Sequence, residues 1–221
     1  MPITKSPVRK GGAREVERTS SGRENILREA ATLFAAKGYT ESGLREIAEM
    51  AGVCSATVYH HFVSKEKIYE EIIRIALDAI SAAVTAELLA LPLDATPRMR
   101  IEASITGHLR ALHTSQPFTS TNAHSRIRMP QEVNSVVGQM REQYSDFWRA
   151  LLEEAKAAGS FKPGVEPNML RPLILGTLNQ TLGWFDSDNG SLETLTRTIV
   201  TLLSGIWNEP DRAARVRKRR A

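Results

Sequence analysis

The stretch from Gly38 to Lys67 limits the possible folds of this chain more than any other. A short amphipathic pattern over 44–50 is followed by small residues around Gly52, and a second short pattern runs from 54 or 55 to 61. Glycine can take the positive φ that a tight turn needs. Apolar residues keep the inward-facing spacing of helices on both sides of the turn: Leu44, Ile47, Ala48, Val58 and Phe62. The spacing predicts two short helices joined by a tight turn, either a helix-turn-helix or an ordinary helical hairpin.

The rest of the chain also shows helical periodicity, and no stretch shows a convincing strand pattern. A helix is predicted from Gly22 until Gly38 ends it with a left-handed turn. Ser42 or Gly43 is the expected N-cap of the helix over 44–50. Further helices are predicted over about 65–89, 99–112, 132–158, 167–185 and 191–207, with a loop at 114–121 and a short helix or turn at 126–130. The sequence therefore predicts an all-α fold.

Composition divides the chain of 221 residues into four parts. Residues 1–21 have Pro and Gly but no apolar periodicity, and are expected to be a flexible basic arm. Residues 22–68 hold the turn motif, 69–208 form a helical body, and 209–221 form a basic tail. The net charge of +4 is too small to indicate a nucleic-acid partner. The basic ends can supply phosphate contacts or can be solvated, disordered tails, and both interpretations stay open.

Cysteine content and hydropathy bear on the compartment. Cys54 is the single cysteine, which excludes an internal disulfide framework and a cysteine-rich metal site. No apolar run approaches the about 20 residues of a membrane span, and the basic N-terminus lacks the apolar stretch of a signal peptide. We expect a cytoplasmic protein without a membrane partner.

The second short helix has an outward face that suits DNA. A recognition helix needs short polar or methyl-bearing side chains that can approach base edges in the major groove. Ser55, Ala56 and Thr57 meet this need, and Tyr59 and His60 are placed to reach bases or phosphates. Periodicity alone does not separate this hypothesis from a helical hairpin in which Gly52 only ends a helix.

Residues 23–70 resemble the DNA-binding domain of the TetR family of bacterial repressors. The similarity is carried in order by these groups: Ile26-Leu27, Ala30-Ala31, Leu33-Phe34, Gly38-Tyr39, Ile47-Ala48, Ala51-Gly52-Val53, Thr57-Val58-Tyr59, His61-Phe62 and Ser64-Lys65-Glu66. The resemblance implies a three-helix, helix-turn-helix DNA-binding domain over 22–68.

The resemblance also implies individual DNA contacts. Thr57, Tyr59 and His60 would contact the operator. Lys65 would hold a phosphate at the start of the next helix, where the helix dipole adds attraction. Ser42 and Arg45 would meet the DNA backbone.

Two positions depart from the family pattern. Cys54, also among the expected DNA contacts, stands where the family commonly has Ser. It is interpreted as a small, semi-buried thiol, with a redox sensor as the alternative. Gly43 stands where a hydroxyl-bearing residue is usual, so Ser42 is expected to take over its capping role.

For the body, the resemblance implies a ligand-binding and dimerisation domain whose last two helices form the dimer interface. A homodimer suits two DNA half-sites. Leu195, Ile199, Leu202 and Ile206 follow 4-3-4 spacing and are the expected seam. The same spacing also fits plain core packing.

A ligand site is expected where polar and aromatic residues interrupt the apolar helices. The candidates are Tyr144, Phe147, Trp148, Asn179 and Trp184, for which core packing or a polar dimer face is the alternative interpretation. The stretch LGTLNQTLGWFDSDNGSL is similar to one TetR subgroup, several members of which respond to acyl-CoA esters. The phosphates of CoA would need basic partners. Arg126 is the expected one, and Arg128, Arg141 and Arg171 are further candidates. Ligand binding would shift the population toward a geometry that leaves the operator, which makes the expected protein a repressor.

Two other classes of protein are alternatives to this regulator. One is a ligand-independent architectural DNA-binding protein, and the other is an all-α enzyme. The chain lacks Glu-x-x-His pairs, a haem-attachment motif, a P-loop and a glycine-rich dinucleotide turn, so no catalysis and no cofactor are expected. No metal site is expected either, because the adjacent His60 and His61 would point about 100° apart on a helix.

Overall fold

The computed structural model describes residues 12–124 and 131–208, and within them it contains helices, turns and a single isolated bridge between Phe161 and Trp207. The fold is all-α, as predicted. The α-helices are α1 (Gly12–Lys37), α2 (Leu44–Met50), α3 (Ser55–His61), α4 (Lys65–Leu89), α5 (Pro97–Thr114), α6 (Phe118–His124), α7 (Gln131–Ala157), α8 (Pro167–Gln180) and α9 (Leu192–Leu202). Short 3₁₀ helices cover Thr181–Gly183, Ser187–Asn189 and Leu203–Ile206.

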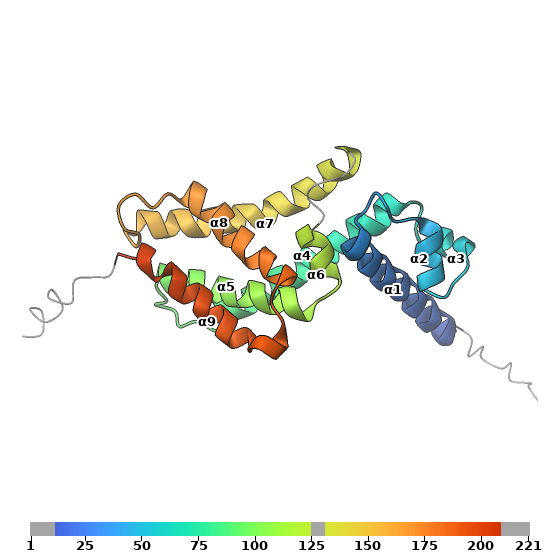
Figure 1. Cartoon of the computed structure of the whole chain (residues 1–221), viewed down its shortest axis with the longest axis horizontal. Helices are drawn as coiled ribbons and strands as arrows, with labels where there is room; N and C mark the ends of the chain where they lie inside the picture. Colours follow the sequence, from blue (N-terminus) through green and yellow to red (C-terminus); the bar gives the residue numbers. More distant parts are fainter. Residues whose placement is uncertain (1–11, 125–130, 209–221) are drawn as a thin grey trace, which may run out of the picture.

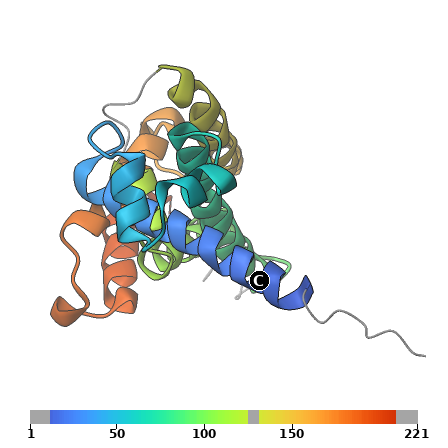
Figure 2. The ribbon, with the colours of Figure 1, turned by 90° about the vertical axis from the view of Figure 1, so that its right-hand side faces the viewer.

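Helices α1–α3 form one end of an elongated molecule, here called the head, and α5–α9 form the body (Figure 1). Figure 2 looks onto the head end and shows α2 and α3 beside α1. α4 runs from the head into the body. The boundary predicted between 68 and 69 therefore falls inside α4.

Two hydrophobic clusters build the core, and α4 contributes to both. The first joins α1, α2 and α3 to the first half of α4, with Ile26, Phe34, Ile47, Val58 and Ile72 all buried. The second joins the later part of α4, from Ile80 and Val84, to α5, α7, α8 and α9. The predicted apolar stripes thus define the packing of both ends of the molecule.

Several predicted boundaries were wrong. α1 begins at Gly12, so residues 12–21 are helical rather than a flexible arm. α6 occupies 118–124, within and beyond the loop predicted at 114–121. α8 ends at Gln180 and α9 at Leu202, and 3₁₀ turns follow each. The element predicted at 126–130 lies outside the described residues. Residues 1–11 of the basic arm and all of the basic tail, 209–221, lie outside them as well.

Candidate nucleic-acid interface and cavity

The turn between α2 and α3 has the predicted geometry. Gly52 has a φ of 65° and Gly38, which ends α1, has a φ of 86°. Asn25 of α1 donates its side-chain N–H to the Ala51 carbonyl over 2.9 Å. Lys37 of α1 forms an ion pair with Glu46 of α2. α1 therefore braces the turn from behind and fixes α2 relative to α3.

α3 is held by one buried side chain and presents its other face to solvent. Val58 is fully buried, while Ala56, Tyr59 and His60 are exposed and Ser55 and Thr57 are half-buried. Tyr59 is 58% exposed, which is unusual for a large aromatic residue in a packed helix. The structure thus places the five predicted α3 residues on one short helix, with the long polar ones outermost.

Cys54 is the N-cap of α3 and is exposed, so the expected semi-buried position was wrong. Its Sγ lies 3.2 Å from Thr57 Oγ1. The hydrogen bond with Thr57 lowers the pKa of the Cys54 thiol. The thiol therefore belongs to the same exposed surface as the α3 side chains.

Ser42 has a different role from the one predicted. Its hydroxyl donates to the Gly38 carbonyl over 2.7 Å, and the residue is only 2% exposed. The N-cap of α2 is Gly43, without a side-chain cap. Ser42 therefore closes the turn after α1 and has no surface for a DNA contact, whereas Arg45 is exposed on α2 as expected.

Lys65 is largely committed to contacts inside the head. Its Nζ donates to the carbonyls of Tyr39 and Ser42, both over 2.9 Å, and lies 4.2 Å from the centre of the Tyr39 ring. Burial lowers the pKa of Lys65. The side chain ties the start of α4 to the loop before α2. A phosphate contact by Lys65 stays a prediction, and it would have to use the third N–H of the ammonium group.

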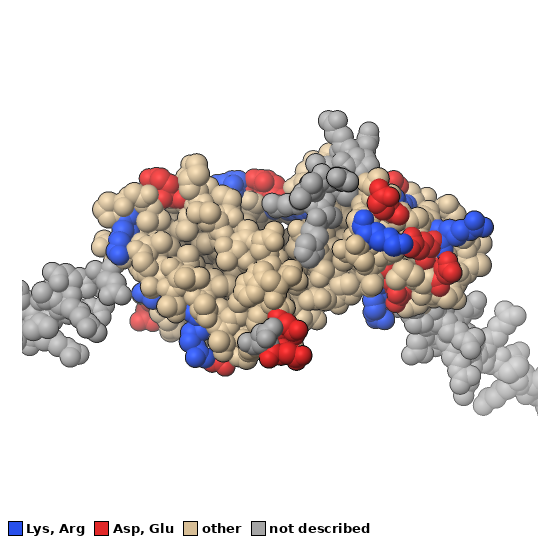
Figure 3. Space-filling view, in the orientation of Figure 1, with Lys and Arg blue, Asp and Glu red and all other residues tan. Residues whose placement is uncertain are grey.

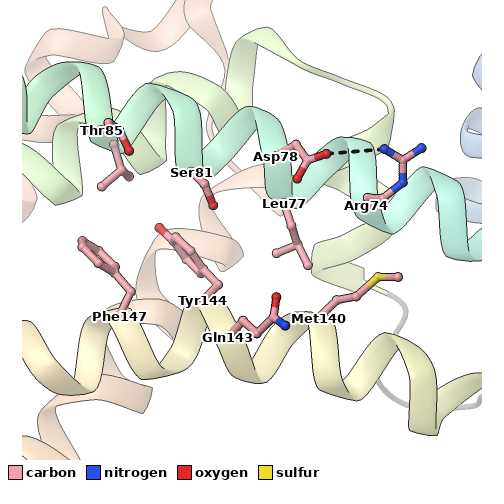
Figure 4. Close-up of a pocket in the computed structure, with 10 residues that line it drawn as sticks. Arg74, Leu77, Asp78, Ser81, Thr85, Met140, Gln143, Tyr144 and Phe147 are labelled. Carbon is pink, nitrogen blue, oxygen red and sulfur yellow. Dashed lines mark ion pairs between the residues drawn. The ribbon is translucent and has the colours of Figure 1, made fainter.

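In the body, a cavity of about 520 Å³ lies between α4 and α7 (Figure 4). Leu77, Ser81 and Thr85 of α4 face Met140, Gln143, Tyr144 and Phe147 of α7, and Arg74 pairs with Asp78 at the end nearer the head. The lining is mainly apolar with a few polar groups, as small-molecule sites are. The arrangement can hold a ligand with an apolar part and a polar end.

The structure brings together only part of the predicted ligand set. Tyr144 and Phe147 line the cavity, whereas Trp148 is fully buried in the core and Trp184 is 63% exposed on the surface. Asn179 does not line this cavity and contacts His108 instead. Arg126 and Arg128 lie outside the described residues. The other two basic candidates are engaged within the body, where Arg141 binds Asn122 and Arg171 binds Ser145.

A buried polar chain supports the cavity wall. Tyr144 Oη lies 2.8 Å from His108 Nδ1, and His108 Nε2 lies 3.4 Å from Asn179 Oδ1. Burial lowers the pKa of His108 to about 4, so the imidazole is neutral. A neutral imidazole can accept from Tyr144 while it donates to Asn179. His108 thereby links α5, α7 and α8 behind the cavity.

Sequence reasoning missed the α4 side of the cavity. Leu77, Ser81 and Thr85 are spaced four apart, so they share one helix face. Polar residues at this spacing in an otherwise apolar helix were the available signal. An apolar stripe by itself predicts only core packing for α4.

The predicted dimer seam was wrong in part. Leu195 and Ile199 are each only 6% exposed and pack in the core of their own chain, and Ile206 is half-buried. Leu202 is 75% exposed. Other exposed apolar residues on α8 and just after it accompany it: Met169, Leu173 and Trp184.

Within the described residues, no three His, Cys, Asp or Glu side chains gather as a metal site requires. Across the same part of the chain, none of the helices combines the length and the apolar character needed to cross a membrane.

Both ends of the chain match known protein families. Residues 26–72 match the family described as "Bacterial regulatory proteins, tetR family". Residues 94–206 match the family "Tetracyclin repressor-like, C-terminal domain".

Individual relatives resemble the chain over most of its length. The HTH-type transcriptional repressor KstR2 of Rhodococcus jostii is 30% identical over 75% of this chain and 80% of the relative. The fatty acid metabolism regulator protein of Bacillus subtilis is 25% identical over 83% of this chain and 95% of its own. The crystal structure of AibR in complex with isovaleryl coenzyme A and operator DNA has the same fold, with a TM-score of 0.69 and 24% identity over 82% of this chain and 97% of that one.

Proposed function

Because the chain belongs to the TetR family of bacterial regulatory proteins, we propose that it is an operator-binding repressor that an acyl-CoA-type effector releases from DNA. The observation that carries this proposal is the outward face of α3. Its relatives are transcriptional regulators, and we propose that this chain also acts by binding rather than by catalysis. Its place of action would be the cytoplasm, where operator DNA is found.

The DNA-reading residues proposed are Arg45, Cys54, Ser55, Ala56, Thr57, Tyr59 and His60. Their exposure on a short helix braced by α1 and α2 supports insertion into the major groove. Arg45 lies on the preceding helix, where a guanidinium suits the phosphate backbone. Ser42 is excluded from this set because it is buried.

We propose a homodimer formed through α8 and α9. Leu173 on α8, Leu202 on α9 and Trp184 between them are exposed large apolar residues, which an interface formed by these helices would cover. The face over α8 and α9 also has few charges, whereas the head is densely charged (Figure 3). A two-fold dimer would present two α3 helices to two half-sites.

We place the effector in the cavity between α4 and α7. Its volume and mainly apolar lining suit an acyl group, and the acyl-CoA in the AibR complex and the fatty-acid role of the Bacillus relative support this ligand class. α4 supplies one cavity wall and begins directly after α3. A ligand that favours one position of α4 would therefore shift the population of head positions.

The test is operator binding by the full chain, with fluorescence anisotropy on duplex from the gene's own upstream region. Tyr59→Ala should weaken binding by about tenfold or more, since one base-reading contact contributes about 1–3 kcal/mol. Arg45→Ala should weaken binding to all sequences and reduce the salt slope by about 1.

The control variants are Met99→Ala and Arg149→Ala, which change partly exposed body residues and should leave binding unchanged. Wild-type binding that is neither salt-dependent nor sequence-selective would overturn the regulator proposal. Release of the bound operator by acyl-CoA esters, added in a series of chain lengths, tests the effector. If none of them releases it, the effector assignment is wrong while DNA binding stands.

A further inference from the structure

A second hollow, of about 470 Å³, continues the α4–α7 groove toward the far end of the body. The end of α4 and the following turn supply about half of its lining, including four leucines, of which Leu89 and Leu93 are among the most exposed apolar residues of the described chain. Its charged lining residues are Arg100 and Glu154, which pair with each other over 2.8 Å. Apart from this pair, no polar side chain within residues 12–124 and 131–208 lines the hollow, so an apolar chain would meet mainly leucine, alanine and proline there.

Phe147 lines both hollows. Its ring packs against Tyr144 with centroids 6.0 Å apart, and edge-on against Trp148 at 6.1 Å. The side chain is only half-buried, so it is not fixed on all sides by the core. Phe147 is thus a partition between two hollows that share the same two helices as walls.

The polar groups are distributed unequally along this groove. Arg74, Asp78, Ser81 and Gln143 line the hollow nearer the head, and the leucine-rich hollow lies beyond Phe147. From Arg74 to Leu89 the helix rises by about 22 Å at 1.5 Å per residue. That length suits a ligand with a polar end and a long, flexible apolar chain.

We propose that the two hollows form one elongated site for a long acyl chain, and that Phe147 is the residue that determines the accepted chain length. This inference rests on the proposed effector site and deepens it. The polar end of the ligand lies near Arg74 and Ser81, and the chain passes Phe147 toward Leu89. The shared chemistry is the acyl chain, which can arrive as a CoA thioester or as a free fatty acid.

The test is isothermal titration of the full chain with saturated acyl-CoA esters of four, eight, twelve and sixteen carbons, and with the matching free acids. Phe147→Trp enlarges the partition, and Leu89→Asp puts a charge at the exposed far end, where folding should tolerate it. Each buried methylene strengthens binding severalfold, so both variants should lose about tenfold or more with the sixteen-carbon ligand and little with the four-carbon ligand. Phe147→Ala should instead strengthen binding of the sixteen-carbon ligand relative to the four-carbon ligand.

The matched control is Val63→Asp, which adds the same charge at an exposed apolar residue between α3 and α4, outside the residues that line the two hollows. It should leave the chain-length profile unchanged. An unchanged profile in both Phe147→Trp and Leu89→Asp overturns the elongated site, even if short esters still release the operator. No binding of any acyl ligand to the wild type overturns both the site and the effector assignment. A preference for thioesters over free acids identifies which form of the chain is the ligand.

Discussion

His108 is a buried titratable group that the fold keeps neutral. Burial lowers the pKa of His108 to about 4. The unfolded chain would take up this proton near pH 6.5, so acid favours the unfolded state. We expect His108 to lower the free energy of unfolding by up to about 3 kcal/mol as the pH falls from about 6.5 to 4. Urea unfolding at a series of pH values measures this loss.

His108→Gln should remove this part of the pH dependence. Glutamine keeps a polar group beside Tyr144 and Asn179 but has no proton to gain. His60→Gln, at an exposed position on α3, should leave the dependence in place. If the wild type and His108→Gln lose the same free energy between pH 6.5 and 4, His108 is not the group responsible.

At the residue scale, the sequence predicted which positions are apolar better than what they contact. Leu195 and Ile199 follow the same helical spacing whether they face their own core or a second chain, so periodicity could not separate these roles. Trp148 was misplaced for the same reason, since a buried aromatic and a cavity aromatic look alike in a sequence. The α3 residues were placed correctly because the turn at Gly52 fixes which face points outward.

At the scale of elements, α4 and α5 pack closely because α5 has glycine at position 107. A Cβ there would lie 2.6 Å from Val84 Cα and 2.7 Å from the Ala83 carbonyl oxygen. Gly107→Ala should therefore push the helices apart and lower the free energy of unfolding by about 1–3 kcal/mol, as overpacking a core does. Thermal or urea unfolding measures this cost.

Gly138→Ala is the matched control, inside the first half of α7, where an added Cβ would meet nothing within 4 Å. It should be neutral or stabilising by about 0.5–1 kcal/mol, because alanine favours a helix more than glycine does. Equal destabilisation by both substitutions would mean that the short distance at Gly107 is not the cause.

Helices with a regular apolar stripe were predicted within a few residues, and those without one were missed. α7 runs over 131–157 against a prediction of 132–158. The first ten residues of α1 are GAREVERTSS, which favour a helix in part but carry no apolar stripe. α6 was hidden because it follows Pro117 and is rich in polar residues. Periodicity detects packing, so it gave no signal in these two segments.

At the scale of the whole molecule, the proposed dimer depends on exposed side chains of α8 and α9. Leu202→Arg would place a charge at an exposed apolar residue of the proposed interface, and should weaken dimerisation by about tenfold or more. Operator affinity should fall with it, because one head reads only one half-site. Sedimentation velocity at micromolar concentration measures the dimer fraction.

Leu93→Arg is the control for this change, since Leu93 is fully exposed in the turn after α4, where it lines the second hollow with residues of α4 and α7. It should stay dimeric. A Leu202→Arg protein that remains dimeric, or a Leu93→Arg protein that dissociates, would assign the interface to another surface.

α4 gives buried side chains to both hydrophobic clusters, from Ile68 to Leu77 in one and Ile80 and Val84 in the other. Neither cluster can open without exposing apolar residues of this one helix to water. Denaturant should therefore melt the head and the body in a single cooperative transition. A substitution that destabilises the body should then also weaken operator binding, even when every DNA-contacting side chain is intact.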